Sequence, residues 1–306
     1  MRGSINYQAQ IAFNQINGIE SSKKKSREVS GIKGENGHKV SDKIHSLKSK
    51  DQFIRITKDF LNHQKTYFNM QPDLHNLSSE HLYSYISSKI EKGLKYKSIS
   101  TYISQLHKLS IAINKIEDKS TQKVKDSREA NYNLNDIRNI RIVAKNEAIS
   151  NQHVNRAYIN SNAIRAHLSG KELLSFKLQK DYGLRVAAAT KININQFKVN
   201  NRFTFKNKGG KPQTVKLDKN LYNELKNSVI KNNGYQISYN FYLEKLKKAV
   251  HKTGQKYYGT HGLRYAFAQS KFNQYQKDGL NSIQAQLKVS NELGHNRPDI
   301  TKHYLK

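Results

Sequence analysis

Near its end the sequence reads Leu293-Gly294-His295 and then Ile300-Thr301-Lys302-His303-Tyr304-Leu305, so that a tyrosine stands nine residues after a histidine. An earlier His261-Gly262-Leu263-Arg264 precedes both segments. Alone, His-x-x-Arg is a weak motif, because chance supplies roughly 0.5 copies in a chain of this size and composition. A second copy, His153-Val154-Asn155-Arg156, is not followed closely by a Leu-Gly-His segment and a tyrosine, and it is interpreted as a chance match. The order of the segments makes His261, Arg264, His295 and Tyr304 candidate functional residues.

The chain carries a large excess of positive charge. Its 54 Lys and Arg residues against 23 Asp and Glu give a formal net charge of +31 and an isoelectric point of about 10.0. A coding sequence rich in A and T would raise the lysine content, but it would not explain the scarcity of acidic residues. A polyanionic partner is therefore favoured. Nucleic acid fits better than a membrane, because no apolar run approaches the roughly 20 residues that span a bilayer.

The absence of cysteine excludes several classes of site. With no Cys in 306 residues, the chain has no disulfide, no thiolate nucleophile and no Cys-based zinc or iron–sulfur site. It also lacks a Gly-x-x-x-x-Gly-Lys-Ser/Thr phosphate-binding loop. We expect neither a cofactor nor a metal. Residues 1–18 are polar, which predicts no signal peptide and, with the lack of Cys, a cytoplasmic location.

Length and composition predict two folded domains behind a basic arm. Residues 1–50 are rich in Ser, Lys, Gly and Asn, which predicts a flexible arm. Residues 51–125 predict a small helical domain, and residues 126–306 predict a second, larger one. Between them, residues 118–128 are rich in Lys, Asp and Ser and predict a linker.

Residues 51–125 contain candidate helix-capping residues and apolar residues at helical spacing, and both indicate helices. Ser78 is placed to open one helix that Gly93 ends, and Ser98 is a candidate N-cap for the next helix. That next helix carries one apolar stripe with helical spacing, formed by Ile99, Ile103, Leu106, Leu109, Ile113 and Ile116.

A short β region interrupts the helices of the second domain. Arg202–Phe205 and Thr214–Leu217 flank a segment with Gly-Gly beside Pro212, and this turn chemistry predicts a hairpin. Helices are predicted at about residues 219–232, 240–252 and 261–275. The predicted fold class is therefore mainly α with a small β hairpin.

The second half of the chain resembles the tyrosine recombinases, also called phage integrases. Asp181-Tyr182-Gly183-Leu184-Arg185 is similar to the family's Gly-Leu-Arg, and the hairpin lysine, His-x-x-Arg, Leu-Gly-His and tyrosine follow in family order. The resemblance covers the chain from about Asn133 onward and extends more loosely through the preceding helical unit. It implies a core-binding domain at residues 51–125 and a catalytic domain at residues 126–306 that close around duplex DNA with specific recombination sites, as a homotetramer.

The resemblance also implies a role for each candidate residue. Cleavage of a phosphodiester without a metal needs cations on the non-bridging oxygens, a nucleophile, and an acid for the departing oxygen. Arg185 and Arg264 would clamp the phosphate, and His295 would bind it by a hydrogen bond. His261 would act as the base for Tyr304, which would attack the phosphorus. Lys208 would protonate the departing 5′ oxygen. For the lysine, Lys206 and Lys211 are alternatives.

Attack by Tyr304 would leave a 3′-phosphotyrosine and a free 5′ hydroxyl, which permits religation without ATP. The chain departs from the family pattern at Ala188, where an acidic residue usually follows the first arginine by three positions. Ser270–Lys288 is predicted to be a polar insertion that lengthens the segment between His261 and His295. Two alternatives remain: a DNA-binding protein that keeps the fold without cleaving, and an enzyme similar to type IB topoisomerases.

Overall fold

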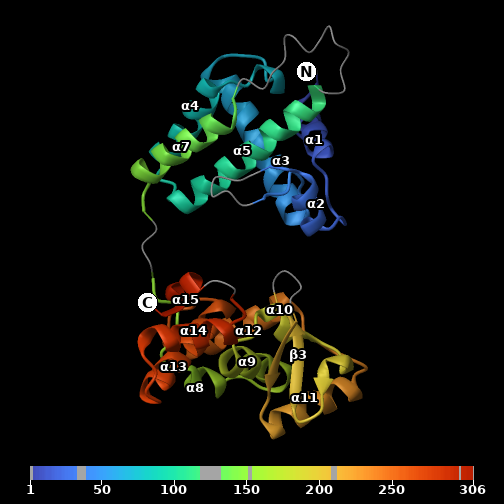
Figure 1. Cartoon of the computed structure of the whole chain (residues 1–306), viewed down its shortest axis with the longest axis vertical. Coiled ribbons are helices and arrows are strands. Elements are labelled where there is room, and N and C mark those ends of the chain that lie inside the picture. Colours follow the sequence, from blue (N-terminus) through green and yellow to red (C-terminus); the bar gives the residue numbers. More distant parts are fainter. Residues whose placement is uncertain are drawn as a thin grey trace. The chain divides into compact units, whose positions relative to one another are not determined.

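The computed structural model describes residues 3–32, 39–117, 132–150, 154–207, 212–295 and 298–305. It divides into two compact units, Met1–Gln152 and His153–Lys306, both shown in Figure 1. Helices dominate both units, and the strands are confined to the second. The predicted fold class, mainly α with a small β hairpin, is confirmed.

The first unit is a helical domain with one apolar core. Its elements are α1 (Ile5–Gln15), α2 (Lys23–Val29), α3 (Leu47–Tyr67), η1 (Leu74–Asn76), α4 (Ser79–Glu91), α5 (Tyr96–Glu117) and α7 (Leu134–Glu147). Ser78 caps α4, and Gly93 follows its end with φ +71°, as predicted. The apolar stripe of α5 lies in the core, with Ile116 only partly buried. The capping role expected of Ser98 is wrong, because α5 already begins at Tyr96.

The composition of residues 1–50 predicts a flexible arm, but the described part of this segment is folded onto the first unit. Helix α1 packs on α3 and α5 and buries Ala9, Ala12 and Phe13 completely or nearly so. Beyond α1, the N–H of Ile44 donates to the carbonyl of Ile16 at 2.8 Å, and the N–H of Gly18 donates to the carbonyl of Ile44 at 2.9 Å. The spacing of these apolar residues is helical, so a short stripe drives α1 into the core although its neighbours are polar.

The boundary between the units also differs from the expected one at residues 125 and 126. Helix α7 buries Ile137, Ile140 and Ala144 in the core of the first unit, so the division falls between residues 152 and 153. An apolar stripe predicts that a helix is buried, but it does not say in which core. The expected linker at residues 118–128 lies outside the described residues.

The second unit is built mainly of helices. Its helices are α8 (Ser161–Arg165), α9 (Gly170–Tyr182), α10 (Val186–Thr190), η2 (Ile194–Gln196), α11 (Lys219–Lys231), α12 (Tyr239–Lys252), α13 (Thr260–Lys277), α14 (Ser282–Glu292) and α15 (Pro298–Leu305). Helix α13 packs against α9, α14 and α15. The segment expected to be a polar insertion forms the end of α13 and much of α14, where Tyr275 and Ala285 are buried.

Two small antiparallel sheets complete this unit. One pairs β1 (Lys191–Ile192) with β5 (Tyr235–Gln236), and the other orders β2 (Phe197–Lys198), β3 (Arg202–Lys206) and β4 (Pro212–Lys216). Thr204 of β3 lies opposite Thr214 of β4, so the predicted hairpin is confirmed. Among the described residues, no helix combines the length and the apolar character needed to cross a bilayer.

Candidate active site

Two of the candidate residues lie in the first two turns of α13 (Thr260–Lys277). His261 and Arg264 are three positions apart, so they share one face of the helix. Between them, Gly262 allows another segment to approach closely. A Cβ atom on Gly262 would lie 2.6 Å from the Tyr158 ring and 2.8 Å from the carbonyl oxygen of Arg156. Glycine is therefore required for the packing of residues 156–158 against the start of α13.

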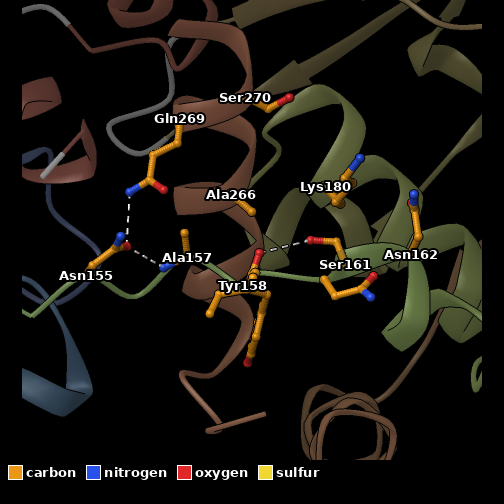
Figure 2. A pocket seen from close by; sticks show the side chains of 11 residues that line it. Asn155, Ala157, Tyr158, Ser161, Asn162, Lys180, Ala266, Gln269 and Ser270 are labelled. Carbon is orange, nitrogen blue, oxygen red and sulfur yellow. Dashed lines mark hydrogen bonds between the residues drawn. The ribbon is translucent and has the colours of Figure 1, made fainter. Parts of the chain in front are cut away.

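Hydrogen bonds fasten this neighbouring segment to α13. Figure 2 shows Asn155 pointing toward Gln269, whose side-chain amide donates to Asn155 Oδ1 at 3.0 Å. The same oxygen accepts from the backbone N–H of Ala157 at 2.9 Å. The Tyr158 hydroxyl donates to the carbonyl of Gly259, just before α13, at 2.9 Å. A cavity of about 420 Å³ lies along this side of α13. The bonds of Asn155, Ala157 and Tyr158 flank Arg156, whose charge reaches His261.

Glycines also set the direction of the chain before Arg185 and before His295. Gly183 ends α9 with φ +65°, and a Cβ there would lie 2.7 Å from the Phe267 ring. Arg185 follows with extended backbone at the start of α10. Gly294, after the end of α14, has φ +60°, a conformation that favours glycine. The two turns place Arg185 and His295 toward the first turn of α13.

Arg264 connects its own His-x-x-Arg motif with the Gly-Leu-Arg segment and the Leu-Gly-His segment. Its side chain is only 2% exposed, and its terminal nitrogens donate to the carbonyl oxygens of Gly183 and Leu293. One of them also lies 3.4 Å from Nε2 of His295. Its buried Nε–H finds no acceptor among the described residues. A buried donor without a partner is costly, so an acceptor that reached this atom would be favoured.

The Tyr304 hydroxyl lies 3.0 Å from Nε2 of His261. Tyr304 is 7% exposed, and its ring packs on Tyr265 with centroids 4.4 Å apart and on His295 at 5.1 Å. Its backbone carbonyl accepts from Gln269 Nε2 at 3.1 Å, which fixes the end of α15 to α13. The tyrosine and one histidine are therefore held within hydrogen-bond distance before any ligand arrives.

Burial, together with the charges of neighbouring arginines, keeps both histidines of the site neutral. Loss of hydration, followed by the charges of Arg264 and Arg185, lowers the pKa of His261 and of His295 to about 4. Burial and then Arg185 lower the pKa of Arg264 to about 10, which leaves it charged at neutral pH. No carboxylate of the described residues is among the causes of these shifts. The site is an uncompensated cluster of positive charge, suited to a phosphate.

The bonds of His295 indicate which nitrogen carries its proton. Nε2 faces a guanidinium nitrogen of Arg264, which can only donate, so Nε2 accepts. Nδ1 therefore carries the hydrogen and donates to Oγ1 of Thr301 at 3.0 Å. Thr301 is fully buried.

The structure brings five of the six sequence-predicted site residues together: Arg185, His261, Arg264, His295 and Tyr304. The sixth, Lys208, lies outside the described residues. Three neighbours do not follow from the motifs, namely Tyr265, Thr301 and Arg156; after burial, Arg264 and Arg185, the charge of Arg156 also contributes to the lowered pKa of His261. Arg156 had been set aside as part of a chance motif. Within the described ranges, no group of three or more His, Asp or Glu side chains gathers as metal ligands would.

Comparison with protein-family models gives no match, and neither does comparison with curated proteins. Solved structures do match. One is a lambda integrase dimer bound to a COC′ core site, with 13% sequence identity and a TM-score of 0.55 over 85% of this chain and 72% of that chain. Another is the Tn1549 transposon integrase in complex with a circular intermediate DNA, with 15% identity and a TM-score of 0.53 over 97% of this chain and 94% of that chain.

At this low identity the likeness concerns the fold alone. The match to the transposon integrase extends over nearly the whole chain, through both units. The resemblance predicted from the motifs is thus confirmed at the level of three-dimensional structure: the chain has the two-domain, mainly helical fold of the tyrosine recombinases.

Proposed function

We propose that the protein is a site-specific DNA recombinase, or integrase, that cleaves and rejoins duplex DNA through a 3′-phosphotyrosine. The observation that carries this proposal is the contact of 3.0 Å between the Tyr304 hydroxyl and Nε2 of His261. It lies beside the buried guanidinium of Arg264, which keeps one donor without a partner among the described residues. A nucleophile, a base and an anion site are then in one place.

The arginines would bind the scissile phosphate. Arg264 is fixed by two carbonyls and offers its Nε–H, and Arg185 lies close enough to lower the pKa of both histidines. Guanidinium groups stay charged and present forked donors, so they neutralise the charge that grows on the non-bridging oxygens in the transition state. The neutral His295, oriented by Thr301, would contribute a further polar contact.

His261 would remove the proton from the attacking tyrosine. A phenol has an ordinary pKa near 10, so attack at neutral pH needs a base. His261 is neutral at pH 7 because its pKa is lowered to about 4, and its Nε2 faces the Tyr304 hydroxyl. As the Tyr304 oxygen bonds to phosphorus, the bond from phosphorus to the 5′ oxygen breaks. We assign the proton for that oxygen to Lys208, and religation reverses each step.

Duplex DNA with specific recombination sites is the proposed substrate, and a homotetramer the proposed assembly. The charge of +31 supports a nucleic-acid partner. The matched lambda integrase is a dimer on a core site, and the matched transposon integrase holds a circular intermediate DNA. Both matched proteins are thus bound to DNA, in the fold that this chain shares.

The test is the formation of an SDS-resistant protein–DNA adduct on nicked suicide duplexes taken from DNA that flanks the gene. The nick lets the cleaved 5′ end diffuse away, so the covalent intermediate accumulates. An adduct supports the proposal and maps the cleaved bond. Tight binding without an adduct would assign the alternative of a non-cleaving DNA-binding protein. Plasmid relaxation without recombinant products would assign a topoisomerase-like activity.

Salt dependence checks the DNA interface separately from cleavage. If the protein encloses a duplex through Lys and Arg contacts to phosphates, log Kd should rise with log salt at a slope near 0.9 per phosphate neutralised. For six or more contacts, affinity falls by roughly 10³-fold or more between about 50 and 200 mM salt. Fluorescence anisotropy with a labelled duplex measures this, and a flat response would contradict the interface.

The pH dependence of cleavage should reflect the lowered pKa of His261. A base works in its neutral form, so activity is present above the pKa and is lost as pH falls through it. With a pKa of about 4, cleavage should persist at pH near 5.5, where an ordinary histidine with a pKa near 6.5 would be mostly protonated. Single-turnover adduct rates, with circular dichroism at each pH to confirm folding, measure it. A midpoint near pH 6.5 would contradict this role.

A further inference from the structure

We infer that Asn207 and Gln213 are positioning residues, which join Arg185 to the end of α14, directly before the Leu293-Gly294-His295 turn, through an uncharged bridge of two side-chain amides. The geometry of the bridge stands on the structure alone, and its consequence for catalysis rests on the proposed function. Neither residue belongs to the motifs that point to the active site.

The bridge is a continuous chain of hydrogen bonds. Arg185 donates from Nη1 to Oδ1 of Asn207 at 2.7 Å. Nδ2 of Asn207 donates to Oε1 of Gln213. Nε2 of Gln213 in turn donates to the carbonyl of Glu292 at 2.5 Å, with the carbonyl of Asn291 at 3.5 Å. Each amide uses its oxygen toward one end of the chain and its nitrogen toward the other, so the direction of the bridge is fixed.

Gly294 makes room for the bridge. A Cβ atom at this position would overlap Nδ2 of Asn207 and lie 2.6 Å from Oε1 of Gln213. The glycine therefore serves two purposes, because it also adopts φ +60° after the end of α14. The residue that follows is His295, whose Nε2 faces Arg264. Loss of the bridge should let this turn shift relative to the arginines.

The bridge also joins β3 and β4 at the end of the hairpin that lies next to residues 208–211. Asn207 directly follows β3, and Gln213 lies in β4 opposite Phe205. In sequence the two residues stand on either side of residues 208–211, which include Lys208.

An amide suits this position better than a carboxylate would. It accepts a hydrogen bond from Arg185 without cancelling the positive charge that attracts phosphate. The chain has Ala188 where the family pattern usually has an acidic residue, and no described carboxylate shifts the pKa of His261, Arg264 or His295. Replacement of Asn207 by aspartate would place a negative charge within hydrogen-bond distance of Arg185, where it would compete with the phosphate.

Alanine variants of the bridge test the catalytic role. With saturating suicide duplex, single-turnover cleavage should slow about 10- to 100-fold in Asn207→Ala and in Gln213→Ala, while Kd for the duplex stays within about threefold. Because both residues act as one unit, the double variant should be no slower than the worse single variant. Asn207→Asp should additionally weaken duplex binding. Gln196→Ala is the matched control, since Gln196 bonds to Thr204 and Asn193 in the same unit away from the site.

Hydrogen exchange tests, independently of cleavage, whether the bridge holds the Leu293-Gly294-His295 turn in place. The N–H groups of Leu293, Gly294 and His295 donate to carbonyls in the last turn of α14, so peptides that cover them should exchange faster in both bridge variants and not in Gln196→Ala. Wild-type cleavage rates in the variants, or strictly additive losses, would overturn the catalytic role while the proposed function stands. If the wild-type protein forms no adduct, the proposed function fails, and unchanged exchange would then overturn the bridge itself.

Discussion

Tyr304→Phe should abolish the covalent adduct, with a loss on the order of 10⁴-fold or more, while duplex affinity stays within about threefold of wild type. Phenylalanine keeps the ring that packs on Tyr265 and His295 and removes only the hydroxyl that faces His261. The cost of that single hydrogen bond is about 1 kcal/mol, so the variant should fold normally. The measurement is adduct formation on the nicked duplex beside an anisotropy titration.

The matched control is Tyr265→Phe. Tyr265 is also a buried tyrosine on the same stack of rings, with its centroid 4.4 Å from that of Tyr304, but it lies on α13. The Tyr265→Phe variant should retain the rate of adduct formation to within about tenfold, because the hydroxyl of Tyr265 is not the proposed nucleophile. An adduct that persists in Tyr304→Phe would place the nucleophile elsewhere, and mass spectrometry of the DNA-linked peptide would identify it.

The sequence predicted the elements whose signals are local. The stripe of α5 has helical spacing over its whole length, and the Gly-Gly and Pro212 beside two short β segments specify a hairpin. The site residues could be found because His261 and Arg264 are close in sequence and the other motifs stand in family order. These signals need no knowledge of which surfaces meet in three dimensions.

The sequence could not reveal partners that only tertiary structure brings together. Arg156 approaches the site because Gly262 admits its backbone, and the only sequence signal was a motif that chance also supplies. Thr301 and the pair Asn207 and Gln213 act through hydrogen bonds to residues on other elements, for which spacing gives no sign. Helix α1 was missed although the spacing of Ala9, Ala12 and Phe13 would have predicted it.

The two arginines should differ in what their removal does to the fold. Arg264→Ala should lower the free energy of unfolding by about 3–5 kcal/mol and cleavage by about 10³-fold or more. Its side chain donates to the buried carbonyls of Gly183 and Leu293, and alanine leaves both without that donor and opens a cavity. Arg185→Ala should slow cleavage by about 10²- to 10³-fold with little loss of stability, because its bond is to the partly buried side chain of Asn207.

Urea unfolding and single-turnover cleavage, measured on the same preparations, separate the two effects. Arg264→Lys sharpens the comparison, because lysine keeps a positive charge but cannot reach both carbonyls with a planar fork. It should therefore lose stability as well as cleavage, whereas Arg185→Lys should lose mainly cleavage. Equal stability of all four variants would show that the contacts of Arg264 with Gly183 and Leu293 do not hold the motifs together. In that case the position of the Leu293-Gly294-His295 turn would depend on its packing and on the amide bridge, rather than on the buried guanidinium.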